Sequence, residues 1–206
     1  MRVFFLLLGL LVAPLAAQAE TAILAGGCFW CVESNFESVP GVSDVVSGYT
    51  GGATANPTYK QVGQGGTGHY EAVKIIFNPG AISYSQIIAK FLRSSDVLDA
   101  GGQFCDRGDS YRTAIFAKGA AQKAAAEAEV AKAEAELGQK IVTPVLAAKP
   151  FYNAEDYHQN YYKGDSIVIT RRGPKSQAEA YKFYRNACGR DARLKQLWGD
   201  AAVFVH

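Results

Sequence analysis

Gly26-Gly27-Cys28-Phe29-Trp30-Cys31-Val32-Glu33 is the stretch around which this chain is organised. It directly follows a short apolar run, Thr21 to Ala25, that predicts a β-strand, and it opens a segment, Phe29 to Ser38, that predicts an α-helix. Cys28 is therefore expected at a strand-to-helix turn, where unpaired N–H groups and the positive end of the helix dipole favour a thiolate. A cysteine that serves only as a small buried apolar side chain is the simpler interpretation. The setting favours a reactive thiol.

The first nineteen residues have the pattern of a cleavable signal peptide. Arg2 supplies a positive charge, residues 3–12 form an apolar run, and Ala17-Gln18-Ala19 is a small-x-small cleavage signal. The alternative is an uncleaved membrane anchor, but the apolar run is shorter than the roughly 20 residues that a span needs. We expect a mature chain that begins at Glu20, is exported to a bacterial periplasm or secreted, and has no membrane association after cleavage.

The length and charge of the chain limit its organisation and its partners. The 206 residues carry a formal net charge of +2, and no basic run is interleaved with aromatic residues, so nucleic-acid binding is not expected. After the predicted signal peptide at 1–19, we expect one catalytic domain at 20–165 and a C-terminal helical extension at 166–206.

The chain contains four cysteines, Cys28, Cys31, Cys105 and Cys188. In an exported protein an even number suggests structural disulfides, although a chain of this length can bury a core without them. A zinc site made of all four is a further alternative, but such sites normally pair two CxxC motifs and only one is present. We expect no metal and no organic cofactor.

The remaining segments predict an α+β domain rather than a doubly wound sheet. Strands are predicted at 42–49, 70–77, 112–117 and 141–147. Helices are predicted after the cap Ser83, at 119–137, at 154–162 and at 176–198, the last of them broken near Cys188-Gly189. Two irregular loops, 51–68 and 94–108, are rich in glycine, and loops of that length in a compact domain are usually functional.

With these segments in place, the chain resembles the A-type peptide methionine sulfoxide reductases, MsrA, over most of residues 21 to about 165. The resemblance implies an α+β two-layer sandwich with a mixed, mostly antiparallel sheet, helices packed on it, and long active-site loops. It rests on the order and spacing of these motifs: Gly27-Cys28-Phe29-Trp30, Pro40-Gly41-Val42, Gly48-Tyr49-Thr50-Gly51-Gly52, Asn56-Pro57-Thr58-Tyr59, Thr67-Gly68-His69-Tyr70-Glu71-Ala72-Val73, Tyr111-Arg112, and Phe151-Tyr152-Asn153-Ala154-Glu155-Asp156-Tyr157-His158-Gln159.

The resemblance implies roles for particular side chains. Cys28 would attack the sulfoxide sulfur as a thiolate, and Glu71, with a raised pKa, would give a proton to the oxygen. Phe29 and Trp30 are the expected wall around the methyl group, although core packing is what aromatic residues do most often. Tyr59 and Tyr111 match the family's tyrosines that orient the sulfoxide oxygen, and Asp106 matches the family's loop acid. Less specific candidates are Tyr49, His69, His158 and Tyr161.

The implied reaction converts methionine S-sulfoxide, free or in proteins, to methionine and leaves Cys28 as a sulfenic acid. A resolving cysteine then forms an intramolecular disulfide, which a thioredoxin-like external dithiol reduces. The family's glycine-rich C-terminal tail with its resolving cysteine is absent here, and Asn186-Ala187-Cys188-Gly189-Arg190 stands in its place. We favour Cys188 as the resolving residue, with Cys31 and Cys105 as alternatives.

Two other functions remain open from the sequence. The Cys28–Cys31 CxxC motif is compatible with a periplasmic thiol–disulfide oxidoreductase, but that chemistry usually comes with a thioredoxin-like fold, which the order of predicted elements does not suggest. A module that captures oxidised methionine without turnover is the other alternative. Release of methionine from a sulfoxide peptide by the reduced protein distinguishes the reductase from both.

Overall fold

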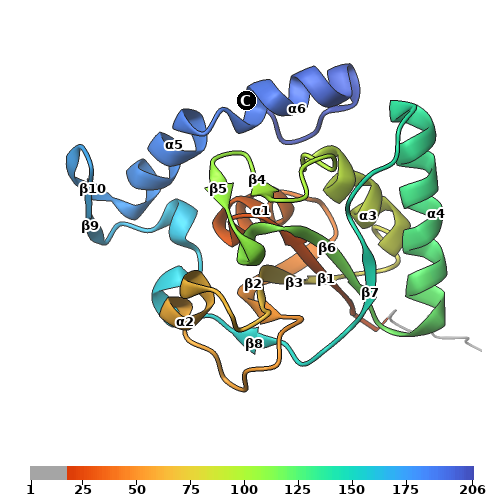
Figure 1. Cartoon of the computed structure of the whole chain (residues 1–206), viewed down its shortest axis with the longest axis horizontal. Helices are drawn as coiled ribbons and strands as arrows, with labels where there is room; N and C mark the ends of the chain where they lie inside the picture. Colours follow the sequence, from red (N-terminus) through yellow and green to blue (C-terminus); the bar gives the residue numbers. More distant parts are fainter. Residues whose placement is uncertain (1–17) are drawn as a thin grey trace, which may run out of the picture.

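The computed structural model describes residues 18–206 and is built on one six-stranded sheet (Figure 1). The predicted signal peptide lies almost entirely outside these residues. The order of strands across the sheet is β7-β6-β1-β3-β2-β8, and only the β6–β7 pair is parallel. The strands are β1 (Glu20–Gly26), β2 (Val42–Thr50), β3 (Tyr70–Phe77), β6 (Thr113–Ala117), β7 (Val145–Ala147) and β8 (Tyr152–Asn153). The predicted α+β class with a mixed, mostly antiparallel sheet is confirmed.

The antiparallel pairing brings distant parts of the sequence to one end of the sheet. Leu24 of β1 lies opposite Val73 of β3, so the chain that leaves β1 emerges beside the start of β3. Gly26 lies opposite Thr113, the first residue of β6, and the residue opposite Glu71 is Tyr49 near the end of β2. The turn after β1, the start of β3 and the segment before β6 therefore meet at the same end.

The larger hydrophobic core lies between the sheet and the helices α1 (Phe29–Glu37) and α3 (Tyr84–Arg93). α3 begins with a capping box between Ser83 and Gln86, and it buries Ile87, Ile88, Phe91 and Leu92 on one side, which is the helical spacing expected from the sequence. α4 (Gly119–Leu137) packs against α3 and follows the predicted range. The opposite face of the sheet carries a smaller apolar cluster that the segment from β7 to β8 covers with Leu146, Ala148 and Phe151.

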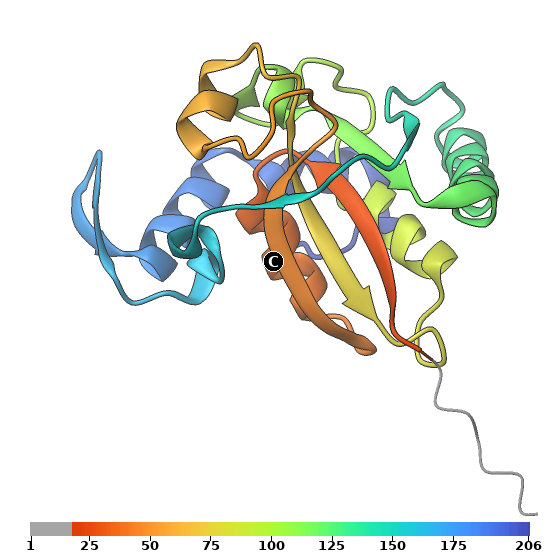
Figure 2. The same ribbon diagram turned by 90° about the horizontal axis from the view of Figure 1, so that it is seen from below.

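The C-terminal part of the chain runs across the end of the sheet that carries the turn after β1 (Figure 1). A hairpin of β9 (Ile167–Thr170) and β10 (Gly173–Ser176) projects from the body of the molecule (Figure 2). It leads into α5 (Gln177–Ala187) and α6 (Arg190–Trp198), which are separated at Cys188-Gly189 as the sequence predicts, and a 3₁₀ turn, η4 (Gly199–Ala201), follows. A disulfide joins Cys188 to Cys105, which lies between the short strands β4 (Gly102–Gln103) and β5 (Asp106–Arg107).

Three predicted segments differ from the structure. The loop 51–68 contains a helix, α2 (Tyr59–Gln64), which the sequence signals did not lead us to expect although it begins with a capping box between Thr58 and Gln61. No α-helix forms at 154–162, where the chain makes two 3₁₀ turns, η2 (Asp156–His158) and η3 (Tyr161–Lys163). Asn160 between them has φ +56° and gives its N–H to Glu33, so its backbone cannot continue a helix. The strand predicted at 141–147 is limited to β7, which begins directly after Pro144.

Within residues 18–206, no helix combines the length and the apolar character needed to cross a membrane.

Candidate active site

Cys28 occupies the N-cap position of α1, two residues beyond the end of β1. Gly27 makes this turn possible because its φ is +79° and a Cβ there would lie 2.5 Å from the Cβ of Gln103. The Cys28 carbonyl accepts the first hydrogen bonds of the helix from the N–H groups of Cys31 and Val32. The Cys28 side chain makes no capping hydrogen bond, and its partly exposed sulfur lies at the positive end of the helix.

Cys28 and Cys31 are free thiols on the same turn of α1, and Cys31 is buried. The hydrogen bond between the two side chains lowers the pKa of Cys31 to about 6, with help from Arg190 and Arg185, while burial opposes ionisation. The same contact, together with burial, raises the pKa of Cys28. Since the groups interact strongly, both values belong to the pair. The pair loses its first proton more readily than an isolated thiol and holds the second one tightly.

Glu71, the second residue of β3, lies beneath the N-terminus of α1. Its carboxylate Oε2 accepts a hydrogen bond from the N–H of Phe29 at 3.2 Å, so the carboxyl group is held next to the residue that follows Cys28. Burial raises the pKa of Glu71 to about 8, against the lowering effects of the Phe29 N–H and the Tyr111 hydroxyl. A carboxyl group in this state carries a proton at neutral pH and can donate it.

Tyr59 and Tyr111 reach this carboxyl group from two different elements. Tyr111 ends the 3₁₀ turn η1 (Asp109–Tyr111) just before β6, and its hydroxyl lies near enough to Glu71 to lower the pKa of that carboxyl group. Tyr59 begins α2, and its hydroxyl interacts with that of Tyr111. Burial raises the pKa of both tyrosine hydroxyls, and the nearby Glu71 raises it further. Both hydroxyls therefore remain protonated donors at neutral pH.

Glu155 fixes the position of this group of side chains. Its carboxylate accepts hydrogen bonds from the Tyr49 hydroxyl and from the Tyr59 N–H, both at 2.9 Å. The sequence alone did not assign Glu155 a role, although it lies within a motif of the family resemblance. Both ring nitrogens of His69 contact backbone groups. Nδ1 accepts a hydrogen bond from the Gly52 N–H, and Nε2 lies 2.7 Å from the Thr54 carbonyl oxygen. His69 therefore ties the loop after β2 to the start of β3.

The two aromatic residues after Cys28 have different surroundings. Phe29 is buried among the rings of Tyr49, Tyr59 and His158, and it lines neither of the cavities described below. Trp30 stacks face to face on Tyr161, with ring centroids 3.7 Å apart, and it lines both cavities. The indole N–H of Trp30 and both ring nitrogens of His158 are buried without a hydrogen-bond partner among the described residues.

A cavity of about 130 Å³ lies over the thiol pair. Asp106, at the start of β5, lines it, and burial raises the pKa of its carboxyl group despite the nearby Arg190. The disulfide-bonded Cys105 and Cys188 line it as well, so all four cysteines of the chain meet at one place. The other residues of its lining are Trp30, Phe104, Tyr181, Tyr184, Arg185 and Arg190.

A more open groove of about 610 Å³ lies on the other side of Trp30. Tyr59, His158 and Tyr161 line it together with the exposed Tyr157. Burial lowers the pKa of His158 to about 4, so its imidazole is neutral at physiological pH. Trp30 is thus the residue that lines both the cavity and the groove.

The structure thus gathers nearly all of the predicted site residues at one end of the sheet. Five further residues that line the cavity were not expected from the sequence: Phe104, Tyr181, Tyr184, Arg185 and Arg190. Four of them lie on the C-terminal helices, where no motif places them near Cys28, and Phe104 lies in the loop next to Cys105. Within residues 18–206, no group of three or more histidine, cysteine or acidic side chains has the arrangement of a metal site.

Comparison with known proteins agrees with this arrangement. Among solved structures, methionine sulfoxide reductase A of Corynebacterium diphtheriae superposes with a TM-score of 0.64 and 28% identity, over 81% of this chain and 89% of that one. Mxr1 of Saccharomyces cerevisiae, solved in complex with Trx2, is 21% identical with a TM-score of 0.50, over 74% of this chain and 91% of that one, and supports the fold alone. These likenesses define the fold as that of the A-type methionine sulfoxide reductases.

The sequence comparison identifies the family. Residues 20–199 match the family model described as peptide methionine sulfoxide reductase. Peptide methionine sulfoxide reductase MsrA 2 of Rhizobium meliloti is 48% identical over 94% of this chain and 90% of its own. The chain belongs to the peptide methionine sulfoxide reductase family, and it is an enzyme of the MsrA type.

Proposed function

We propose that the chain reduces the S epimer of methionine sulfoxide, free or in proteins, with Cys28 as the nucleophile and Glu71 as the general acid. One observation carries this assignment: a buried carboxyl group with a raised pKa is hydrogen-bonded to the backbone N–H of the residue that follows a helix-capping cysteine. Nucleophile and proton donor are thus held together by secondary structure rather than by flexible side chains.

The first half of the reaction transfers the sulfoxide oxygen to Cys28. The Cys28 thiolate attacks the sulfoxide sulfur while Glu71 protonates the oxygen, and the sum of the steps gives methionine and a Cys28 sulfenic acid. The Tyr59 and Tyr111 hydroxyl groups supply donors for the oxygen as its negative charge develops. Trp30 lies where an apolar wall for the methyl group is needed, and the unpartnered nitrogens of Trp30 and His158 are available to polar groups of the substrate.

The second half removes the sulfenic acid. We propose Cys31 as the resolving residue, because it is a free thiol on the same turn of α1 as Cys28 and its side chain acts directly on that of Cys28. Its thiolate would displace water from the Cys28 sulfenic acid and form a Cys28–Cys31 disulfide. Cys188 and Cys105, the other candidates, are joined to each other in this structure. An external dithiol then reduces the new disulfide and returns both thiols.

The ionisation of the site predicts a bell-shaped dependence of kcat/KM on pH. The rate should rise with pH as the thiol pair loses its first proton, near pH 6, because the thiolate is the nucleophile. It should fall as pH passes about 8, because Glu71 must carry a proton to donate it. Initial rates with a methionine sulfoxide peptide between pH 5 and 10 check this, and a rate that keeps rising beyond pH 9 would exclude Glu71 as the acid.

Single-turnover experiments identify the resolving cysteine. With all cysteines reduced beforehand, Cys31→Ser should still release about one methionine per chain from the S epimer and none from the R epimer, because Cys28 alone performs the first step. It should form no new intramolecular disulfide, whereas the matched variant Cys188→Ser should form Cys28–Cys31 at the wild-type rate. Peptide mapping by mass spectrometry reads this out. A new disulfide in Cys31→Ser would return the role to Cys188 or Cys105.

We propose a thioredoxin-like protein as the reductant and the periplasm as the compartment. The reductant is supported by family membership and by the yeast Mxr1, which was solved in complex with Trx2. The compartment is supported by the signal-like pattern of residues 1–19 and by the Cys105–Cys188 disulfide, since disulfides persist in oxidising environments. Fractionation of cells that express the full chain, followed by N-terminal sequencing, tests the predicted start at Glu20.

A further inference from the structure

Arg190, the first residue of α6, carries its guanidinium group to the turn that presents Cys28. Its Nη2 donates to the carbonyl oxygen of Gly26, the last residue of β1, at 3.3 Å, and its Nη1 donates to that of Ser94 at 3.2 Å. The guanidinium carbon lies 4.2 Å from the centroid of the Phe104 ring. The residue is 3% exposed, so the cation is enclosed by backbone carbonyls and an aromatic face.

Among the described residues, this buried cation has no carboxylate partner. Across residues 18–206, no carboxylate oxygen lies within 4.0 Å of the Arg190 side-chain nitrogens. Its neighbours differ in this respect, because Arg185 is paired with Asp191 at 2.8 Å and Arg193 with Asp96 at 2.6 Å. Burying a positive charge without an anion is unfavourable, so the location of Arg190 calls for a negative charge close by.

The cavity over the thiol pair supplies that charge. Arg190 lines it together with Cys28, Cys31 and Asp106. Burial raises the pKa of Asp106 and Arg190 lowers it, so the cation acts on this carboxyl group as well as on the thiol pair. The titratable and charged groups that act on the thiol pair from all sides are Glu71, Tyr59, Tyr111, Tyr161, Asp106, Tyr181, Arg185 and Arg190.

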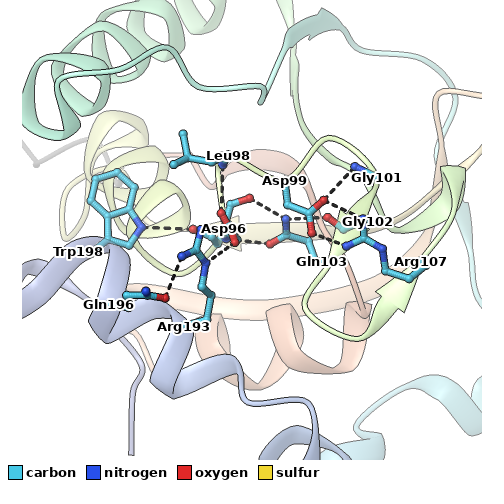
Figure 3. A network of polar contacts seen from close by, with 11 residues as sticks. Asp96, Leu98, Asp99, Gly101, Gly102, Gln103, Arg107, Arg193, Gln196 and Trp198 are labelled. Atoms are coloured by element: carbon cyan, nitrogen blue, oxygen red, sulfur yellow. Dashed lines mark hydrogen bonds and ion pairs between the residues drawn. The ribbon is translucent and has the colours of Figure 1, made fainter.

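The surrounding contacts hold α6, and with it the cation, in place. Arg193 pairs with Asp96, and the Trp198 indole N–H donates to the Ser95 carbonyl oxygen at 3.2 Å, as Figure 3 shows for this network. Within the same loop, the Gln103 side chain accepts a hydrogen bond from the Asp96 N–H and donates one to the Asp96 carbonyl oxygen. At the N-terminal end of α6, Cys188 lies two residues before Arg190 and is joined to Cys105 by the disulfide. Gly189, between Cys188 and Arg190, has φ +65°.

We propose that Arg190 is a positioning residue whose guanidinium group stabilises the thiolate of the Cys28–Cys31 pair and fixes the Gly26 end of the turn. After the hydrogen bond with Cys28, Arg190 is the strongest influence that lowers the pKa of Cys31, followed by Arg185. The inference rests on the proposed function because it takes the thiolate to be the nucleophile. It assigns to the C-terminal extension an electrostatic role in the reactivity of Cys28.

Alkylation of the thiol pair as a function of pH tests this directly. Iodoacetamide rates are measured between pH 5 and 10 on protein whose Cys105–Cys188 disulfide is intact, so that only Cys28 and Cys31 react. In Arg190→Met, which removes the charge and keeps the length, the first ionisation should move up by about one pH unit. Alkylation should then be about fivefold slower than wild type at pH 6 and close to tenfold slower at pH 5, with rates converging by pH 10.

Three further variants separate charge from structure. Arg190→Lys keeps the cation and should follow the wild-type curve. Lys195→Met removes an exposed cation from the same helix and should change nothing. Arg193→Met loses an anchor of α6 and should lower the melting temperature without moving the curve.

The inference is overturned if the folded Arg190→Met variant follows the wild-type curve, or if Arg193→Met shifts the curve equally. If Arg190→Met does not fold, a folded Arg190→Lys whose curve has moved by a full unit overturns it as well. Since no arm of the experiment uses methionine sulfoxide, failure here is distinct from failure of the proposed reductase activity.

Discussion

Replacing Cys28 by serine is expected to lower the rate of methionine release from methionine sulfoxide by at least about 10³-fold, because a serine hydroxyl is not ionised at neutral pH and is a poor nucleophile for sulfur. The change is nearly isosteric, and the Cys28 side chain makes no capping hydrogen bond, so the fold should be retained. Single-turnover release of methionine, measured by chromatography, checks it.

The matched control for this prediction is Cys31→Ser on the same helical turn, which should retain the first turnover. Undiminished release by Cys28→Ser would mean that another thiol reacts with the sulfoxide. That result would contradict the assignment of the nucleophile, although the family membership of the chain would stand.

Replacing Glu71 by glutamine is expected to lower kcat by about 10²- to 10⁴-fold, the usual contribution of a positioned general acid. The amide oxygen of glutamine can still accept the hydrogen bond from the Phe29 N–H, so the variant keeps the local structure while losing the proton donor. The fall in rate above about pH 8 should disappear with the carboxyl group. Steady-state kinetics at several pH values check both effects.

Glu33 offers a matched control for Glu71. It is a second fully buried carboxyl group, its pKa is raised by burial to about 7, and it accepts hydrogen bonds from the Ser47 hydroxyl and the Asn160 N–H. Because Glu33 joins α1 to β2 and to the turn at Asn160, and does not line the cavity over the thiol pair, Glu33→Gln should affect stability more than kcat. Equal losses of kcat in the two variants would show that burial of a carboxyl group, rather than proton donation, explains the effect of Glu71→Gln.

Much of the fold could be predicted because the local signals agree with the final structure. The apolar run before Cys28, the strand at 70–77 and the helix after Ser83 each carry a periodicity or a cap that matches what they become. The site residues Cys28, Glu71, Tyr59, Tyr111 and Asp106 were identified by motif, and antiparallel pairing of β1 with β3 and β6 is the physical reason that they meet.

What could not be predicted depends on contacts over long distances in the sequence. Nothing near Arg190 indicates that its guanidinium group would reach Gly26, and nothing near Cys105 specifies Cys188 as its partner. The helix expected at 154–162 was wrong for the same reason, because Glu33 binds the backbone of Asn160 across more than a hundred residues. The low-complexity helix at 119–137 was predicted from propensity alone, and packing against α3 stabilises it in the structure.

The most direct test of Cys28 as the nucleophile is to trap the first intermediate. Reduced Cys31→Ser, with the Cys105–Cys188 disulfide intact, is given one equivalent of a methionine S-sulfoxide peptide and then dimedone, and the adduct is mapped by mass spectrometry. We predict one methionine released per chain and a single dimedone adduct, at Cys28. Release of methionine without an adduct at Cys28, or an adduct at any other cysteine, would contradict the proposed mechanism.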